Sequence, residues 1–401
     1  MQALNLGHTV ELLQGGEEFF PALVQALDES RLEVRLETYI FNLDASGKAV
    51  AEALLRAAAR GVAVYLVIDG AGTLSLPREL ADRFTAAGLN WRIFSPLGGL
   101  GWFVPRNWRR LHRKLCVVDG QIAFCGGINV LDDFYDPNHG ALNAPRFDFA
   151  VRVSGPLVRD AQEAVTQFWL RLKATRDARE LDFASAWAAL QSAMRLHHPM
   201  AARSGEKPGP GTRAALVLRD NFRNRTRIER AYRKAIGAAR SEIIIANAYF
   251  VPGLRLRSAL VHAARRGVRV RLLLQGKYEY FMQYHAARPV FGALLEAGVE
   301  IHEYSASFLH AKVAVVDARW ATVGSSNLDP LSMLLAREAN VVVDDAPFAS
   351  ELRRRLDVAM QTEGRQLDPS VYAHRPWSQR FMDGIAYWLM RGMLFLNGSR
   401  Y

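Results

Sequence analysis

The stretch Leu111–Asn129 reads LHRKLCVVDGQIAFCGGIN, and the second half of the chain repeats it at Leu309–Asn327 as LHAKVAVVDARWATVGSSN. Both copies hold His-x-Lys, four further residues, an Asp, six residues, and then Gly-[Gly/Ser]-x-Asn. Apolar residues follow each Lys and precede each Gly, which predicts two buried strands joined by a turn after the Asp. A repeat of this kind indicates an internal duplication.

The sequence before each copy repeats as well, in residues 37–70 and residues 246–276. Each segment predicts a strand, a loop, an amphipathic helix, a glycine turn at Gly61 or Gly267, and a buried strand. A strand, a helix and a strand in this order form a parallel pair. We therefore expect an α/β fold of two similar domains, each a mixed sheet flanked by helices, related by a pseudo-two-fold axis.

The 401-residue chain is long enough for two ordinary domains, and half of its residues are apolar. Residues 200–212, MAARSGEKPGPGT, are rich in Gly, Pro and charge and predict a solvated linker. We place the first domain at residues 1–202 and the second at residues 203–376, with the boundary at Ala202. Residues 377–401 are expected to form a separate amphipathic helix that associates with membranes.

The two motifs bring histidines and lysines together. His112 and Lys114 are two apart on a predicted strand and point to the same face, as do His310 and Lys312. Two imidazoles and two ammonium groups in one pocket suit a tetrahedral phosphate, because the lysines neutralise its oxygens without a metal ion or another cofactor. One histidine can attack phosphorus while the other protonates the leaving oxygen. The sequence thus predicts an enzyme that breaks and remakes phosphodiester bonds through a phosphohistidine.

Four further polar residues are candidates for binding phosphate or orienting the histidines. Asn129 and Asn327 follow small residues, which let a ligand oxygen approach the backbone closely. Each motif histidine also needs a carboxylate on its other ring nitrogen, to fix its tautomer and stabilise the imidazolium. Asp148 and Glu338 each open an apolar strand after the motif Asn, so each is expected to return to the site.

Asp119 and Asp317 complete the two motifs and belong to the candidate catalytic set with the histidines and lysines. Each directly precedes a turn residue, Gly120 or Ala318. We interpret both aspartates as groups that stabilise a strand end or turn more than as catalysts.

Lys and Arg number 51 and Asp and Glu 40, a formal charge of +11, which favours phosphate ligands, nucleic acid or an anionic membrane surface. Cys116 and Cys125 lie in apolar runs, so we expect reduced core thiols, which fits a cytosolic location. The N-terminal sequence has no signal-peptide pattern, and no apolar run reaches the roughly 18–20 residues of a spanning helix. We expect a peripheral protein on the cytoplasmic face of a membrane.

Two segments combine aromatic and basic residues in the way that interfacial segments do. They are Leu97–Arg110 (LGGLGWFVPRNWRR) and Trp377–Leu396 (WSQRFMDGIAYWLMRGMLFL). The first is alternatively a lid loop, and the second alternatively a helix packed on the protein. A lid and a membrane contact are compatible.

The paired motifs resemble those of the phospholipase D superfamily, and the resemblance covers most of the chain. The surrounding sequence is more similar still to bacterial cardiolipin synthases of the short type without N-terminal membrane helices. The similar stretches are LETYIFNLDASG, HRKLCVVDGQIAFCGGIN, NAYFVPG, GVEIHEYSASFLHAKVAVVDARWATVGSSNLDPLS and EANVVV. The resemblance implies that one histidine, with His112 favoured, becomes phosphatidylated and that the other acts as acid and base. It also implies that two phosphatidylglycerol molecules yield cardiolipin and glycerol.

Two departures bear on the acceptor. Ala336 stands where such synthases commonly have Asn, and Lys277 is followed by Tyr-Glu-Tyr where an acidic, less aromatic loop is expected. A hydrolytic phospholipase or a nuclease of the same superfamily is the first alternative function, although the aromatic segments favour lipid over nucleic acid. A non-catalytic membrane-binding module is the second, and the intact motifs in both halves argue against it.

Overall fold

The structure, a computed structural model, describes residues 4–96, 108–180, 182–195, 211–220, 224–277, 281–329, 332 and 335–396. The strands of the first half are β1 (Asn5–Gln14), β2 (Glu33–Thr38), β3 (Ala63–Asp69), β4 (Asn90–Phe94), β5 (Arg110–Leu111), β6 (Lys114–Val118), β7 (Ile122–Gly126), β8 (Tyr135–Asp136), β9 (Gly140–Ala141) and β10 (Phe149–Ser154). Its helices are α1 (Gly15–Glu29), α2 (Ala45–Ala59), α3 (Arg78–Ala86), α4 (Leu157–Arg179) and α5 (Phe183–Arg195).

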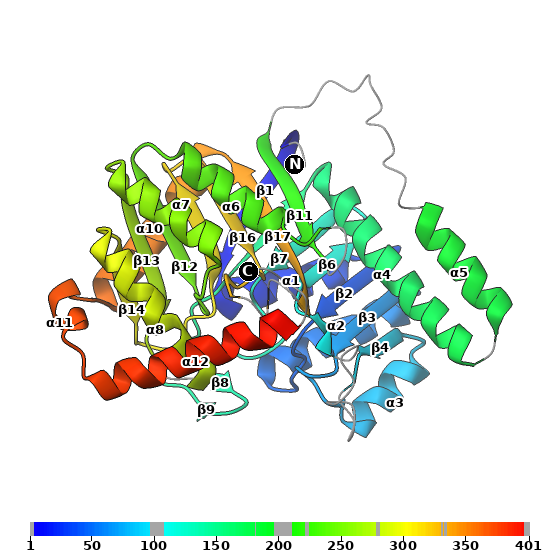
Figure 1. Cartoon of the computed structure of the whole chain (residues 1–401). Coiled ribbons are helices and arrows are strands. Elements are labelled where there is room, and N and C mark those ends of the chain that lie inside the picture. Colours follow the sequence, from blue (N-terminus) through cyan, green and yellow to red (C-terminus); the bar gives the residue numbers. More distant parts are fainter. Residues whose placement is uncertain are drawn as a thin grey trace.

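The strands of the second half are β11 (Thr212–Arg219), β12 (Glu242–Asn247), β13 (Arg269–Gln275), β14 (Glu300–Tyr304), β15 (Lys312–Val316), β16 (Trp320–Gly324), β17 (Ala336–Asp344) and β18 (Gly364–Gln366). Its helices are α6 (Arg227–Ala238), α7 (Leu254–Arg265), α8 (Phe281–Glu296), α10 (Ala346–Thr362), α11 (Pro369–Ala373) and α12 (Trp377–Leu396). Figure 1 shows the two halves beside each other.

The strand order repeats between the halves. Within the described residues it runs β4-β3-β2-β6-β7-β10-β1 in the first half and continues β11-β17-β16-β15-β12-β13-β14-β18 in the second. Outward from the antiparallel β1–β11 junction, the two halves present corresponding strands in the same sequence. The pairs β2–β3 and β12–β13 are parallel and their neighbours β6 and β15 are antiparallel to them. The predicted α/β duplication with mixed sheets is confirmed.

The repeated helix and turn fold alike for local reasons. Asp44 caps α2, because its side chain accepts a hydrogen bond of 3.0 Å from the backbone N–H of Gly47. Buried apolar side chains recur along one face of α2 and of α7. The chain then leaves each helix through Gly61 or Gly267, both with φ of 87°, a conformation that favours glycine. Both glycine turns were expected from the sequence.

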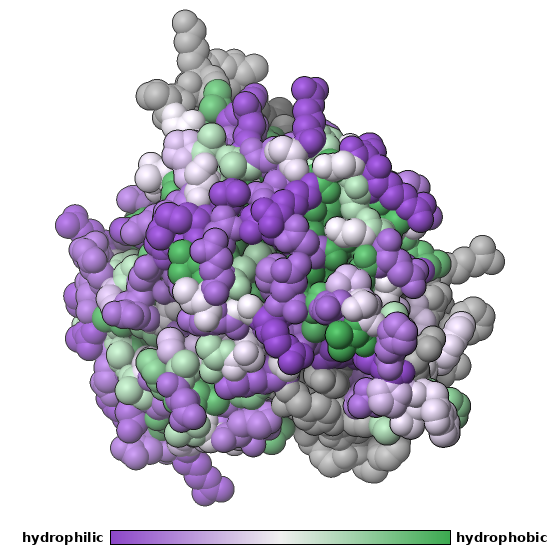
Figure 2. All heavy atoms as spheres, turned by 90° about the vertical axis from the view of Figure 1, so that its left-hand side faces the viewer, coloured by the Kyte–Doolittle hydropathy of each residue, from purple (hydrophilic) through white to green (hydrophobic). Residues whose placement is uncertain are grey.

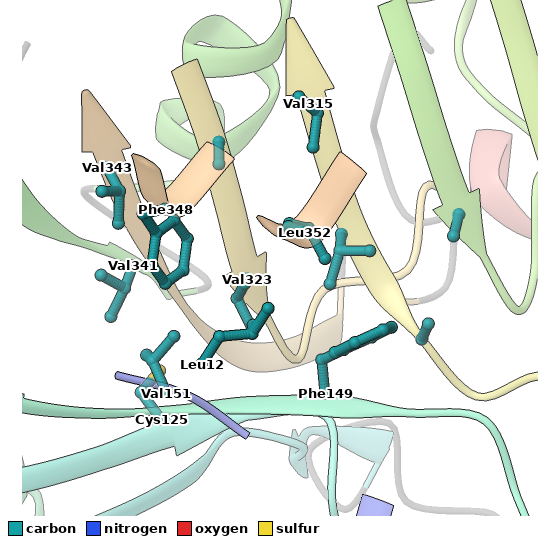
Figure 3. Packing of buried hydrophobic residues seen from close by; sticks show 14 of the residues in the cluster. Leu12, Cys125, Phe149, Val151, Val315, Val323, Val341, Val343, Phe348 and Leu352 are labelled. Carbon is teal, nitrogen blue, oxygen red and sulfur yellow. The ribbon is translucent and has the colours of Figure 1, made fainter. Parts of the chain in front are cut away.

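One hydrophobic core joins the two halves. Figure 3 shows side chains of both sheets converging, with Leu12, Cys125, Phe149 and Val151 from the first half and Val315, Val323, Val341, Val343, Phe348 and Leu352 from the second. Phe149 has no exposed surface, and its truncation to alanine would cost about 3–5 kcal/mol. Separate cores lie under the outer helices, α1 to α3 in the first half and α6 to α8 in the second. Groups on opposite halves are therefore held in a fixed relation.

Both cysteines belong to these cores. Cys116 and Cys125 are buried and free, and burial raises the pKa of each thiol to about 12. The prediction of reduced core thiols is confirmed.

The predicted domain boundary lies in a part of the chain that the structure does not describe. The boundary at Ala202 falls in residues 196–210, outside the described residues, between the end of α5 and the start of β11. No helix in the described part of the chain has the length and apolar character needed to span a bilayer. Figure 2 shows the flank at the left of Figure 1, which carries α11 and β14, and hydrophilic side chains predominate on it. That flank is suited to face water.

Candidate active site

The main chain of each motif histidine is tied to the other half of the protein. The backbone N–H of His112 donates to the carbonyl of Arg337 over 3.1 Å, next to the parallel pairing of β5 with β17. The second half mirrors this, because the backbone N–H of His310 donates to the carbonyl of Phe147 over 2.9 Å. Each of these carbonyls belongs to the residue just before a candidate orienting carboxylate.

The carboxylates cross between the halves. Nδ1 of His112 lies 3.0 Å from Oε1 of Glu338, and Nδ1 of His310 lies 2.6 Å from Oδ2 of Asp148. Both carboxylates are almost fully buried. An ionised carboxylate can only accept, so Nδ1 of each ring carries the proton and Nε2 keeps its lone pair for chemistry. The structure thus brings both predicted carboxylates to the histidines, and each serves the opposite half.

The lysines lie between the two half-sites. Nζ of Lys114 donates to the carbonyl of His112 over 2.8 Å, and Nζ of Lys312 donates likewise to the carbonyl of His310. Both side chains are buried. Burial, and then the charge of Lys312, lowers the pKa of Lys114 to about 7. A bound anion would raise the pKa of Lys114 again, so the two lysines are electrostatically suited to a phosphate.

The two histidines differ in their electrostatics. Burial lowers the pKa of His112, while the nearby charge of Glu338 opposes this effect. The pKa of His310 lies well below its usual value, through burial and then the charges of Lys312 and Lys114. Because a lysine of the first half acts on His310 and a lysine of the second acts on His112, both rings belong to one site.

The pKa of Asp148 is shifted as well. Burial raises the pKa of its carboxyl to about 7, against the opposing charges of Lys312 and Lys114. Oδ1 accepts a hydrogen bond of 2.8 Å from the backbone N–H of Phe149. The proton equilibrium of this group therefore sets the tautomer of His310 near neutral pH.

The Gly/Ser difference between the motifs matches the two carboxylates. A Cβ atom at Gly127 would lie 2.2 Å from Oδ1 of Asp148, so only glycine leaves room there. The corresponding residue in the second half is Ser325, whose hydroxyl donates to Oε2 of Glu338 over 2.5 Å and accepts from the backbone N–H of Ala339 over 3.1 Å. The first half therefore leaves space for its carboxylate at Gly127, whereas the second half binds its carboxylate through the hydroxyl of Ser325.

Asp119 and Asp317 lie at the opposite ends of their strands from the lysines. The carboxylate of Asp119 accepts from the backbone N–H groups of residues 31–33 over 2.8–2.9 Å, and that of Asp317 accepts from those of residues 240–242 over 2.9 Å. Both aspartates adopt a φ of 52° in the turn. These contacts tie the turn to the start of β2 or β12, which is the structural interpretation drawn from the sequence. A catalytic role for either aspartate stays a prediction.

Asn129 and Asn327 are buried behind the motif glycines. Oδ1 of Asn129 accepts a hydrogen bond of 3.2 Å from the backbone N–H of Ile40, which leaves its amide NH₂ as a donor. For Asn327, Oδ1 has no hydrogen-bond partner among the described residues. Binding of phosphate by either amide stays a prediction.

Sequence reasoning missed two positioning residues, Asp69 and Gln275. Oδ2 of Asp69 accepts from the backbone N–H of Leu111 over 2.6 Å, and Oε1 of Gln275 accepts from that of Leu309 over 3.3 Å. Each acceptor thus fixes the residue directly before a motif histidine. Both end a buried strand and precede a glycine in the repeated segments, a signal that was present in the sequence.

The two expected membrane segments have different outcomes. Residues 97–107 lie outside the described residues, and so do Tyr278–Tyr280 beside Lys277. In the C-terminal segment α12 forms as predicted and packs on α8, with Asp383 buried and accepting from His285 over 2.7 Å and Arg375 over 2.9 Å. Its other face leaves Phe381 and Trp388 exposed by 64% and 68%. The alternative of a helix packed on the protein is therefore confirmed, and membrane contact by the exposed face stays a prediction.

The fold agrees with comparisons to known proteins. Residues 23–142 and 232–359 match the family described as cardiolipin synthase, PLD-like domain. Cardiolipin synthase B of Escherichia coli K12 is 38% identical over 394 residues, covering 98% of this chain and 90% of that protein. A probable cardiolipin synthase of Bacillus subtilis is 28% identical, covering 96% and 72%.

Among solved structures, a phosphatidylserine synthase from Haemophilus influenzae superposes with a TM-score of 0.65 at 14% identity, covering 91% of this chain and 89% of that one. This likeness concerns the fold alone. The match to the family and the identity to its curated members decide the assignment: this chain belongs to the phospholipase D-like cardiolipin synthases.

Proposed function

We propose that this phosphatidyltransferase joins two phosphatidylglycerol molecules into cardiolipin and glycerol through a covalent phosphatidyl-histidine. One observation carries the proposal. Each histidine is oriented by a carboxylate of the opposite half, with Lys114 and Lys312 buried beside them. This arrangement supports binding of one phosphate group between two imidazoles, while two ammonium groups neutralise its non-bridging oxygens.

In the first step Nε2 of one histidine attacks phosphorus. The N–P bond forms as the bond from phosphorus to the headgroup glycerol oxygen breaks, and that oxygen takes a proton from Nε2 of the second histidine. Glycerol leaves, and the phosphatidyl group stays on the first histidine. The second ring is then neutral and ready to act as a base.

In the second step another phosphatidylglycerol enters by a free glycerol hydroxyl. The second histidine takes the hydroxyl proton while the oxygen attacks phosphorus and the N–P bond breaks. Cardiolipin leaves, the first histidine is restored, and the second is again protonated. The cycle therefore needs no added nucleotide.

The different pKa values favour His310 as nucleophile and His112 as acid, the reverse of the order that the resemblance favours. A nucleophile must be unprotonated, and burial together with the charges of both lysines lowers the pKa of His310 well below its usual value. An acid must first hold a proton, and the charge of Glu338 supports one on His112. We therefore infer that His310 carries the phosphatidyl group.

A bilayer substrate requires that the site meet a membrane surface. We infer that the exposed aromatic face of α12, together with the +11 formal charge, holds the protein on the cytoplasmic face of an anionic membrane. The packing of α12 on α8 keeps that face at a fixed position on the second half.

The roles can be separated with a phosphatidyl ester of p-nitrophenol, whose leaving group needs no protonation. His112→Ala should release about one equivalent of nitrophenolate in a burst and carry a phosphatidyl group on His310, detectable by peptide mass spectrometry. His310→Ala should give no burst. The opposite pattern would assign the nucleophile to His112.

The reaction itself is tested with phosphatidylglycerol labelled in its headgroup glycerol. Glycerol and cardiolipin should appear in equal amounts with wild-type protein and in neither single-histidine variant. Phosphatidate accumulating without cardiolipin would indicate a hydrolase, and no turnover with intact protein would favour a non-catalytic module.

A further inference from the structure

The outer face of the second half carries a cationic groove that takes no part in the proposed reaction. Figure 1 shows α6 and α7 side by side on this face, with β11 next to α6. A groove of about 780 Å³ is lined by both helices and by Val217 of β11. Its polar wall includes Arg227, Arg230 and Lys234 from α6 and Arg255 from α7. None of the motif histidines, motif lysines or orienting carboxylates lines it.

The positive charge of this groove is not compensated internally. Among the described residues, no carboxylate forms an ion pair with Arg227, Arg230, Lys234 or Arg255, whereas Arg233, which also lines the groove, pairs with Glu229 at 3.9 Å. All four basic side chains are exposed. Several like charges around one hollow create a local positive potential that recruits an anion. A phosphate group suits such a set, because guanidinium groups bind phosphate oxygens by paired hydrogen bonds.

The groove continues into an apolar pocket. A second cavity of about 240 Å³ is lined mainly by small and apolar side chains, among them Ala215, Trp320 and Val342. Val217, Ala231 and Lys234 line both cavities, so the two adjoin along α6. The groove of about 780 Å³ lies within the range of about 300–1,000 Å³ that is usual for ligand sites, and the smaller apolar pocket adjoins it. A cationic end joined to an apolar end fits an amphiphile better than a free anion.

Chain connectivity puts the cationic end on the same side as the active site. Arg219, the last residue of β11, pairs in register with Glu338, and Asn247, the last residue of β12, pairs with Lys312. Both helices start shortly after these strand ends, and Arg227, Arg230 and Arg255 lie in their first turns. A ligand phosphate at these arginines would therefore lie on the side of the domain where the substrate enters.

We propose that this groove is a non-catalytic binding site for an anionic glycerophospholipid. Arg227, Arg230 and Arg255 bind its phosphate, and one acyl chain runs past Ala231 into the apolar pocket. Inorganic phosphate shares the headgroup chemistry and lacks the chain. The site holds a lipid beside the active site without reacting with it.

The test counts bound lipid on the full chain by equilibrium dialysis, with labelled dihexanoyl phosphatidate below its micelle concentration. This phosphomonoester has no headgroup alcohol to displace, so turnover does not interfere. Wild-type protein should bind two equivalents, one in the active site and one in the groove. Arg230→Gln with Arg255→Gln should weaken the second site about tenfold or more. The matched control, Arg78→Gln with Arg265→Gln, removes the same charge outside the groove and should keep both sites.

The Ala231→Trp variant tests the contribution of the apolar pocket, because the larger side chain obstructs the path of the acyl chain and leaves the arginines in place. It should abolish the second lipid site, and inorganic phosphate at equal concentration should not displace the lipid from wild-type protein. Melting curves establish that each variant folds. Equal lipid binding by the groove variant and its control would overturn the site. Displacement by inorganic phosphate or by a short oligonucleotide would overturn its assignment to lipid. Transfer activity is not the readout, so these outcomes leave the proposed reaction untouched.

Discussion

Replacement of Gly127 by alanine should disable the histidine of the other half without touching it. The new Cβ would lie 2.2 Å from Oδ1 of Asp148, whereas real Cβ contacts stay above 3.0 Å, so the carboxylate must move by about 0.8 Å (3.0 minus 2.2 Å). Such a shift would lengthen the 2.6 Å hydrogen bond to His310 to as much as about 3.4 Å and weaken it. A hydrogen bond to a charged group contributes about 1.5–3 kcal/mol. If the loss falls on the transition state, kcat drops about 10- to 150-fold.

The assay is the rate of cardiolipin formation from phosphatidylglycerol, with a melting curve for each variant. Gly237→Ala is the matched control, because a Cβ at Gly237 meets nothing within 4 Å, and it should keep the wild-type rate. Gly127→Ser should be as slow as Gly127→Ala, although Ser325 occupies the equivalent position of the second half. A Gly127→Ala enzyme with kcat within about twofold of wild type would show that Asp148 does not orient His310.

Three further predictions concern pH, positioning and the membrane. For a soluble short-chain substrate, kcat/KM should rise with pH as Asp148 ionises near 7 and fall as Lys114 loses its proton near 7. The Lys114→Arg variant should lose the falling limb of this profile, because its guanidinium stays charged. An unchanged falling limb in this variant would show that Lys114 does not cause it. Asp69→Asn should lower kcat about 10-fold or more, because the backbone N–H of Leu111 loses a charged acceptor at 2.6 Å, and a wild-type rate would refute the positioning role. Trp388→Ser should reduce sedimentation with anionic vesicles about tenfold and preserve turnover of the short-chain substrate, whereas the control Val371→Ser, also at an exposed apolar residue, should change neither.

The sequence predicted the duplication and the motif residues that meet at the candidate site, because both rest on local pattern. Alternating and helical periodicities determine the strand, helix and strand order in each half, and a motif with equal spacing recurs at the same point of both. The strands begin at Lys114 and Lys312, two residues after His112 and His310, so the expected strand period of two does not extend to the histidines and only the spacing of the motif pointed to them. These features need no knowledge of tertiary packing.

The crossing of the carboxylates could not be derived in that way. Asp148 and Glu338 each follow the Asn of their own half, and spacing along the chain does not say which histidine they meet. The pairing arises where two sheets pack through a shared core that includes Phe149 and Val341. That contact is a property of the assembled halves, which local sequence does not encode.

Two other features of the site could not be predicted from the sequence, for different physical reasons. Equal spacing placed Asp119 and Asp317 in the candidate catalytic set, although five residues at about 3.3 Å each separate the Lys and the Asp of a motif by about 16 Å along the strand. Asp69 and Gln275 were missed because an Asp before a glycine reads as a turn residue. Their chemical difference also hides that both accept from the residue before a catalytic histidine.

The scaffold is nearly symmetric, yet the proposed chemistry requires asymmetry, since a nucleophile and an acid need opposite protonation states. The differences sit in a few positions. Gly127 leaves Asp148 close-packed and with a pKa raised to about 7, while Ser325 donates to Glu338. Arg146 adds its charge to the groups that lower the pKa of His310. Because each carboxylate crosses to the opposite histidine, a small change in one half adjusts the ring of the other. Two copies of one motif can thereby hold different roles at a single phosphorus.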